Sequence, residues 1–415
     1  MPAKECEAIK ALSPRRGRLA TILDFARFIM SLLPVAEPVK SAVDALTFVI
    51  SVIISGGALI KGDEKEDEEK RGIVRKVISW ISDRGKAQFT SSLAQFLKSV
   101  NEAWLYLNNE GCRDVVNEVA GEWGMDAESF RSLIGNLRNL TAGRLITEEE
   151  LREKLDELWW GIIKGDLGKY GFNVYLLRDF EKGAYPNVTV INGRLMVRTI
   201  FSEGVGLKGM YVGVVTAGAF ENAAFELAKR LRGGGLTVVI GPRGIGKSTL
   251  AALVLWRALN GGEVNAVVSV SEVNANSEEH LENLLNRCRG DYAAFCGRLV
   301  ILYDPSSIEE YKVPTNIKAT SAGKVEETLR YLTPIAKQTP VIVVLPSDVA
   351  NVLSEDLRKY IEGYSYTPNL KDEEFISEVV KEYSGCAINE DKLREIVKNI
   401  LNFDEGHALI ARLIG

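Results

Sequence analysis

The segment from Gly241 to Ser248 has the residue types and the spacing needed to hold phosphate groups. It reads GPRGIGKS, and the fixed positions of the pattern G-x-x-x-x-G-K-[ST] are occupied by Gly241, Gly246, Lys247 and Ser248. Glycines allow a tight turn in which successive backbone N–H groups point inward at an anion. In this pattern the lysine reaches the β- and γ-phosphates of a nucleotide, and the serine hydroxyl is a ligand of Mg²⁺. The segment is therefore predicted to cradle phosphate, and the alternative is a chance glycine-rich turn.

The elements on either side of this segment are those that a phosphate-binding loop requires. An apolar run at 236–240 predicts a buried strand, and apolar residues at helical spacing over 249–259 predict a helix. The N-terminus of that helix adds its partial positive charge to the phosphate site. We therefore expect a nucleotide to be held by Gly241, Pro242, Arg243, Gly244, Ile245, Gly246, Lys247, Ser248 and Thr249.

A carboxylate at the end of a second strand is expected to complete a metal site. Residues 299–303 read LVILY, a continuous apolar strand, and Asp304 follows directly. Where nucleotide phosphates are transferred, such an aspartate holds Mg²⁺ together with the hydroxyl of the loop. We therefore expect Ser248 and Asp304 to bind Mg²⁺. The alternative is an aspartate that only begins a turn before Pro305.

Apolar strands alternate with helices over about 216–370. Besides the two strands above, the runs at 266–270 and 341–345 are expected to be buried strands, and the segments between them have helical periodicity. Continuous apolar strands that alternate with helices are typical of a parallel sheet covered by helices on both faces. The predicted fold class is therefore α/β, with a three-layer αβα domain of the P-loop NTPase type.

In their order, these motifs resemble those of the AAA+ ATPases, and within them the archaeal ATPases related to the origin-initiator and STAND branches. The resemblance covers about 210–415, roughly half of the chain. It implies that ATP is the nucleotide, that Mg²⁺ is the metal and that ATP hydrolysis is the activity. It also implies that residues 371–415 form a helical lid.

The resemblance assigns catalytic roles to polar residues beyond Lys247 and Asp304. Ser347 or Asp348, at the end of a predicted strand, matches the sensor 1 residue that orients the attacking water. Arg358, on the helix that follows, matches the region of the arginine finger, which acts on the nucleotide of a neighbouring subunit. The resemblance therefore implies a homo-oligomer.

The sequence departs from the family pattern at two places. After the strand-end aspartate the family usually has a glutamate, whereas this chain has Pro305, with Glu309 and Glu310 further on. The glutamate polarises the attacking water, so its replacement bears on hydrolysis and not on binding. At the sensor 2 position Leu409 stands where many members carry arginine, and Arg412 follows one turn later. We also expect no winged helix beyond the lid, which argues against a DNA-initiator role.

Residues 1–170 are predicted to form an N-terminal all-α domain. Within it the predicted helix 87–108 carries a broad apolar stripe of Phe89, Leu93, Phe96, Leu97, Val100, Trp104 and Leu107. Residues 171–215 are predicted to be a short β-containing linker, because β-like runs there flank an Asn-Gly hairpin signal. The nucleotide-binding domain is then expected at 216–370 and the lid at 371–415.

The apolar stretch at 42–60 has Asp44 as its only charged residue. Its length is close to that of a membrane span, but it contains Gly56 and Gly57 and has no aromatic residue at either end. We interpret it as a buried helix of the N-terminal domain. A peripheral or spanning membrane segment and a partner-binding helix are the alternatives.

The composition indicates a globular protein whose charge gives no support for a strongly charged partner such as nucleic acid. The chain has 415 residues, a net charge of -5 and a pI of about 5.5, which gives no support for nucleic-acid binding. The segment from Met1 to Arg18 lacks the apolar core of a signal peptide, so we expect a cytoplasmic protein. The five cysteines include no C-x-x-C pair, so we expect no zinc site and buried thiols, with disulfides as the alternative in a hyperthermophile.

These patterns predict an ATPase that binds ATP or ADP with Mg²⁺ and couples binding or hydrolysis to a conformational change of the N-terminal helical domain. That domain is the expected contact for a protein partner. A slowly hydrolysing, STAND-like nucleotide switch is the first alternative, and Pro305 favours it. A membrane-associated adaptor held by 42–60 is the second.

Overall fold

The chain folds into two compact units. The first comprises Met1–Gly165 and Asn286–Phe295, and the second comprises Asp166–Leu285 and Cys296–Gly415. We call them the helical unit and the α/β unit. The computed structural model describes residues 4–15, 19–32, 40–56, 64–198, 211–242, 244–270, 275–290, 293–305, 319–369, 372–384 and 388–402.

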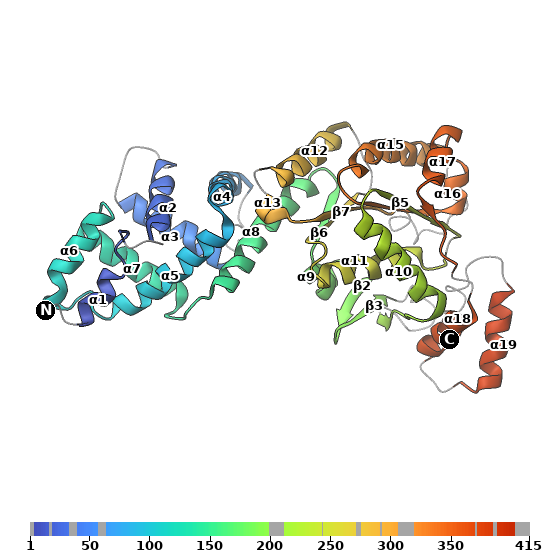
Figure 1. The fold of residues 1–415 in the computed structure, drawn as a ribbon, viewed down its shortest axis with the longest axis horizontal. Coiled ribbons are helices and arrows are strands. Elements are labelled where there is room, and N and C mark those ends of the chain that lie inside the picture. The colour runs from blue at the N-terminus through green and yellow to red at the C-terminus, as the bar shows by residue number, and fades with distance from the viewer. Residues whose placement is uncertain are drawn as a thin grey trace. The chain divides into compact units, whose positions relative to one another are not determined.

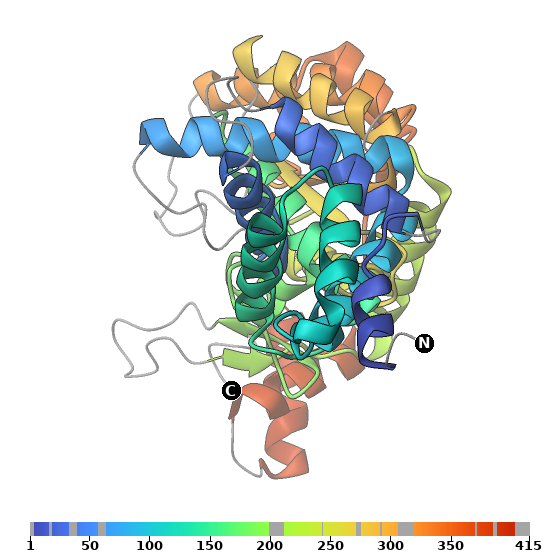
Figure 2. The same cartoon turned by 90° about the vertical axis from the view of Figure 1, so that its left-hand side faces the viewer.

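The helical unit is built from α-helices (Figure 1, Figure 2). Its elements are α1 (Lys4–Lys10), α2 (Leu19–Ser31), α3 (Lys40–Ile54), α4 (Glu64–Arg84), α5 (Lys86–Trp104), the 3₁₀ turn η2 (Glu110–Cys112), α6 (Arg113–Glu122), α7 (Ala127–Thr141) and most of α8 (Glu148–Gly168). The expected all-α N-terminal region is confirmed.

Helix α5 lies at the centre of the helical unit and packs against α1, α2, α4 and α7. Its predicted apolar stripe is core, because Phe89, Leu93, Phe96 and Val100 are fully buried. The ring of Phe89 also meets that of Phe25 from α2, with centroids 4.9 Å apart. Removing this much apolar surface from water is what holds the helices together.

Helix α3 covers most of the apolar stretch at 42–60. Its residues Val43, Leu46, Val49 and Ile50 are buried, and the helix packs against α2 and α7. The expectation of a buried helix is therefore confirmed for this part, while residues 57–60 lie outside the described residues. Among the described helices, none combines the length and the apolar character needed to cross a membrane.

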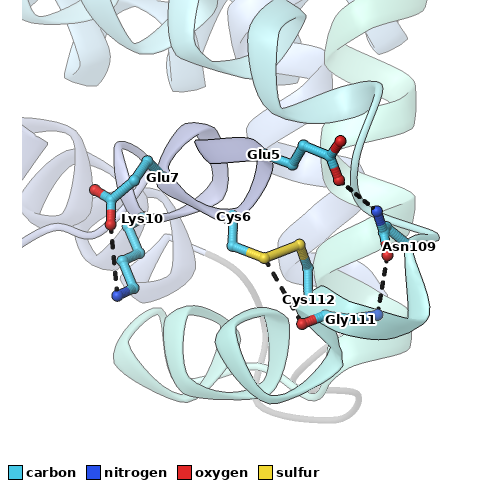
Figure 3. The surroundings of a disulfide bond; sticks show 7 residues. All are labelled: Glu5, Cys6, Glu7, Lys10, Asn109, Gly111 and Cys112. Carbon is cyan, nitrogen blue, oxygen red and sulfur yellow. Dashed lines mark hydrogen bonds and ion pairs between the residues drawn. A yellow bond between two sulfur atoms is a disulfide. The ribbon is translucent and has the colours of Figure 1, made fainter. Parts of the chain in front are cut away.

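A disulfide joins the first helix of the helical unit to the turn before α6. Cys6 and Cys112 are bonded across 106 positions of sequence, and both are buried (Figure 3). Asn109 supports the turn: its side chain accepts a hydrogen bond from the N–H of Gly111 and donates one to Glu5. The expectation of buried thiols was wrong here, because helix packing brings together two cysteines that the sequence separates. Cys288 and Cys296 are disulfide-bonded as well.

The α/β unit contains a six-stranded sheet with the order β1-β6-β7-β8-β5-β9. The strands are β1 (Phe172–Tyr175), β5 (Leu236–Gly241), β6 (Ala266–Val270), β7 (Leu299–Tyr303), β8 (Val341–Pro346) and β9 (Ser365–Tyr366). All neighbouring pairs are parallel except β1 and β6. Every residue of β7 and β8 is buried, as expected for strands covered on both faces. Strand β1, an edge strand, comes from the stretch expected to be a linker.

Helices lie on both sides of this sheet. Figure 1 shows α10 and α11 on one side and α15 and α16 on the other, and contacts of α11 and α15 with β8 agree with this view. The helices of the unit are α9 (Leu177–Glu181), α10 (Gly218–Gly233), α11 (Lys247–Asn260), α12 (Ala275–Arg289), α13 (Ala293–Cys296), α15 (Ala319–Ala336), α16 (Ser347–Asn351), α17 (Glu355–Glu362), α18 (Glu373–Ser384) and α19 (Glu390–Leu401). Part of α12 and of α13 belongs to the helical unit.

A second, three-stranded sheet has the order β2-β3-β4. Its strands are β2 (Val188–Ile191), β3 (Arg194–Arg198) and β4 (Tyr211–Gly213), and the predicted Asn192-Gly193 hairpin joins the first two. Both turn residues have positive φ, which the two-residue hairpin turn requires. Near it, the C-terminal helices α18 and α19 pack against each other, and α18 contacts β4 and α10.

We expect the Cys6–Cys112 disulfide to stabilise the helical unit. The disulfide closes a loop of 106 residues and thereby lowers the conformational entropy of the unfolded chain. We therefore expect the double variant Cys6→Ser/Cys112→Ser to lose about 3–5 kcal/mol of unfolding free energy. Urea unfolding followed by tryptophan fluorescence is suitable, because Trp80, Trp104, Trp123, Trp159 and Trp160 all lie in this unit.

A reductant provides the matched control for this prediction. The urea midpoint of reduced wild type should approach that of the double variant. Comparing the double variant with and without reductant isolates the contribution of the remaining disulfide. A double variant that unfolds at the same urea concentration as the oxidised wild type would contradict the stabilising role.

Candidate functional site

The glycine-rich loop, residues 241–248, joins β5 to α11 as the motif predicts. Gly246 is the N-cap of α11 with a φ of 93°, and Gly244 has a φ of 75°. These left-handed conformations are costly for residues with a Cβ, so the glycines are needed to turn the chain from strand to helix. The N-terminus of α11 therefore starts directly at the loop, and the backbone N–H groups of a first helical turn are suited to donate to an anion there.

The start of the loop is folded back on itself. A Cβ on Gly241 would lie 2.7 Å from Cδ1 of Ile245, whose side chain is buried. The same Cβ would lie 3.5 Å from Cδ of Lys247, so the aliphatic part of the lysine side chain also lies next to this glycine. The compact shape of the loop therefore depends on the missing side chain at 241.

Lys247 is the first residue of α11, and its side chain is buried against the glycine-rich loop. Its side chain is only 5% exposed, and its Nζ donates a hydrogen bond of 2.7 Å to the carbonyl oxygen of Pro242. A buried ammonium group needs polar partners, and this carbonyl is one of them. An anion bound in the loop would take over this donor. Ser248 and Thr249 follow in the first turn and are half-buried, whereas Arg243 lies outside the described residues.

The ends of three parallel strands bring the predicted polar residues to one edge of the sheet. Strand β8 lies between β5 and β7, with Gly241 opposite Pro346 and Tyr303 opposite Val343. Strands in a sheet lie about 4.8 Å apart, so β5 and β7 are separated by about 10 Å. Asp304 therefore follows β7 at the same edge as the glycine-rich loop, and its side chain is 6% exposed.

The remaining predicted catalytic residues lie on surface helices. Ser347 is the first residue of α16 and is half-buried, and the next residue, Asp348, is exposed. Both follow β8 and so belong to the edge of the sheet just described. Arg358 is exposed on α17, which follows α16 along the chain.

Several positions named from the sequence lie outside the described residues. They are Glu309 and Glu310, which follow Pro305, and Leu409 and Arg412 of the expected sensor 2 helix.

One residue near Asp304, the carboxylate predicted to bind Mg²⁺, was not predicted from the sequence: Tyr185. Its ring is buried, and its centroid lies 4.3 Å from that of Phe180 and 4.8 Å from that of Tyr175. Burial, and to a smaller extent the charges of Asp304 and Tyr175, raise the pKa of Tyr185 far above its usual value, so the phenol stays protonated. No sequence signal marks it, because Tyr185 and Asp304 are far apart in the chain and only the folded structure brings them near each other.

Comparison with known proteins adds no family to this description. No protein-family model matches the sequence, and no curated protein matches it. The geometry of the loop and of the strand ends therefore carries the functional argument.

We expect Gly246→Ala to destabilise the α/β unit by about 1–2 kcal/mol, because alanine is strained at this positive φ. The strain comes from the backbone, since the added Cβ would only touch Phe220 Cε2, at 3.6 Å. Gly233→Ala is the matched control: it lies at the end of α10 with open space around the added Cβ and should be neutral or stabilising by up to about 1 kcal/mol.

Urea unfolding followed by circular dichroism compares the two glycine variants. Equal unfolding midpoints would mean that the glycine-rich loop tolerates a Cβ at 246, and the argument for its constrained shape would fail.

Proposed function

We propose that the α/β unit binds ATP with Mg²⁺ at the glycine-rich loop and that the chain is an AAA+-like P-loop ATPase. The observation that carries this proposal is the loop itself: two glycines with positive φ place a buried Lys247 at the start of α11. The position of the loop at the carboxyl edge of a parallel sheet supports it, because ligands of such sheets bind in the crevice outside that edge. In this proposal α18 and α19 are part of the lid.

The residues of the loop fit the phosphate groups and their metal. Backbone N–H groups of the loop and of α11 would donate to the phosphate oxygens, with Lys247 in place of its present bond to Pro242. Mg²⁺ keeps several waters and needs only one or two protein ligands besides phosphate oxygens. Ser248 and the buried carboxylate of Asp304 are suited to this role, and the metal would neutralise charge on the phosphates.

A slowly hydrolysing nucleotide switch is the second candidate function. Pro305 occupies the position directly after Asp304, so the general base usual for this family is replaced by a side chain that cannot accept a proton. Ser347 or Asp348 would then orient water without that base. Binding of ATP or ADP is common to both candidates, and the rate of phosphate release separates them.

The inserted segment 286–295 supports coupling between the nucleotide and the helical unit. It lies between β6 and β7 in the sequence but belongs to the helical unit. Phe295 is buried there, its ring centroid is 5.9 Å from that of Trp159, and Nζ of Lys86 lies 5.2 Å from the centroid. Strand β7 begins shortly after Phe295 and ends beside Asp304. A movement at the metal site would therefore be passed along β7 to this segment.

We expect Lys247→Ala to weaken Mg-ATP binding at least about tenfold, because a charge-assisted hydrogen bond to phosphate is lost. Lys229→Ala removes the same charge from an exposed position of α10 and should leave the dissociation constant unchanged. Isothermal titration calorimetry gives both constants. Absence of ATP binding by the wild type, or equal binding by Lys247→Ala, would contradict the proposed site.

We expect Asp304→Asn to abolish the Mg²⁺ dependence of ATP binding and to abolish phosphate release, since the neutral amide is a poor Mg²⁺ ligand. Asp356→Asn, an exposed aspartate paired with Arg330, is the control and should behave as wild type. Steady-state phosphate release that only Asp304→Asn and Lys247→Ala remove supports an ATPase. Tight binding with no release above the Lys247→Ala background instead supports the switch.

A further inference from the structure

We propose that the stacked rings of Phe220 and Phe375 act as a positioning pair that holds the glycine-rich loop in its phosphate-binding shape and ties this shape to helix α18. The inference deepens the proposed function and rests on it. It concerns neither phosphate nor metal contacts, because both rings are buried hydrocarbon. Their role follows from what they touch on either side.

The two rings come from the first turns of α10 and α18. Their centroids are 5.0 Å apart and their planes differ by 9°, which is a stacked arrangement. Phe220 is 2% exposed and Phe375 is 3% exposed, so water does not separate them. Aromatic pairs of this kind contribute beyond the area that they bury.

On the other side, the ring of Phe220 lies beside Gly246, the N-cap residue of α11, and helices α10 and α11 pack against each other. A Cβ built on Gly246 would lie 3.6 Å from Cε2 of Phe220, which is ordinary van der Waals contact. Gly246 is the N-cap of α11 and has the left-handed φ of 93° that orients the following N–H groups. The ring therefore supports the backbone at the point where the direction of those donors is decided.

Helix α18 is fixed close to both of its ends, with Phe375 in its first turn. At its start, Asp372 accepts a hydrogen bond of 2.9 Å from the N–H of Phe375. A Cβ on Gly218, the first residue of α10, would lie only 2.6 Å from Oδ1 of Asp372. A glycine at this position therefore lets the residue before α18 come close to α10. In its last turns Glu382 pairs with Arg194 of β3 at 3.3 Å.

These contacts form one continuous path within the α/β unit. In this proposal, a displacement of α18 changes the stack at Phe375, and the stack positions the ring of Phe220 that lies beside Gly246. Binding is tighter when the donors of a site are already oriented, because less freedom is lost on binding. Removing the stack is therefore expected to weaken nucleotide binding by about two- to tenfold, the range given by the strength of aromatic pairs.

The test is a double-mutant cycle of Phe220→Leu, Phe375→Leu and the double variant, with Phe130→Leu as the control. Phe130 is buried in the helical unit, so its variant loses a core ring without touching the α/β unit. If Phe375→Leu does not fold, Phe375→Met replaces it. Two quantities are measured: the dissociation constant for Mg-ATP, and amide hydrogen exchange over 244–250 in nucleotide-free protein.

The positioning role predicts a specific pattern. Each single variant raises the dissociation constant about two- to tenfold. The dissociation constant of the double variant is no higher than that of the single variant that binds more weakly. Exchange over 244–250 becomes at least about threefold faster in nucleotide-free Phe375→Leu, although the substituted residue is on a different helix. Phe130→Leu changes neither quantity.

Two results would overturn the inference. One is unchanged exchange over 244–250 in Phe375→Leu, which would mean that α18 and the loop are independent. The other is additive effects of the two substitutions on the dissociation constant. Failure of the proposed function is distinguishable from both, because it appears as a wild type that binds no Mg-ATP, whereas the exchange measurement needs no nucleotide.

Discussion

The parallel pairing of β5, β8 and β7 is the constraint on which the candidate site depends. Residues that follow parallel strands emerge at the same edge of a sheet, so Gly241, Asp304 and Ser347 come together although the sequence separates them widely. The intervening strand β8 separates the axes of β5 and β7 by about 10 Å, so the glycine-rich loop and Asp304 come from strands that are not direct neighbours.

Within the loop, backbone conformation and side-chain burial support each other. The positive φ values at Gly244 and Gly246 form the turn, and the absence of a Cβ at Gly241 lets Ile245 and Lys247 pack across it. The carbonyl of Pro242 accepts from Lys247, so the buried ammonium group has a partner without a ligand. An anion bound in the loop would therefore replace the carbonyl of Pro242 as a hydrogen-bond partner of Lys247. This replacement would not require the loop to change its fold.

The two units are connected by more than one segment of chain. Helix α8 runs from the helical unit into the α/β unit, and the segment 286–295 leaves the α/β unit after β6 and returns as β7. Within the helical unit, the Cys6–Cys112 disulfide and the α5 core limit how far individual helices can shift.

The sequence alone predicted the elements whose signals are local. Strand β5, the glycine-rich loop and helix α11 follow from a glycine spacing and a change of apolar period, and helix α5 follows from its apolar stripe. The Asn192-Gly193 turn is likewise a property of two residues. Such features depend on backbone dihedrals and on periodicity, and both are determined by residues that are close together in the sequence.

The tertiary structure decided what depends on residues far apart in the chain. It assigned β1 to the edge of the large sheet, placed 286–295 in the helical unit, bonded Cys6 to Cys112 and set Tyr185 near Asp304. The stack of Phe220 on Phe375 belongs to the same class. The sequence contains no signal for these pairings, because each arises from which apolar surfaces the chain buries against one another, and that choice is made by the packed molecule as a whole.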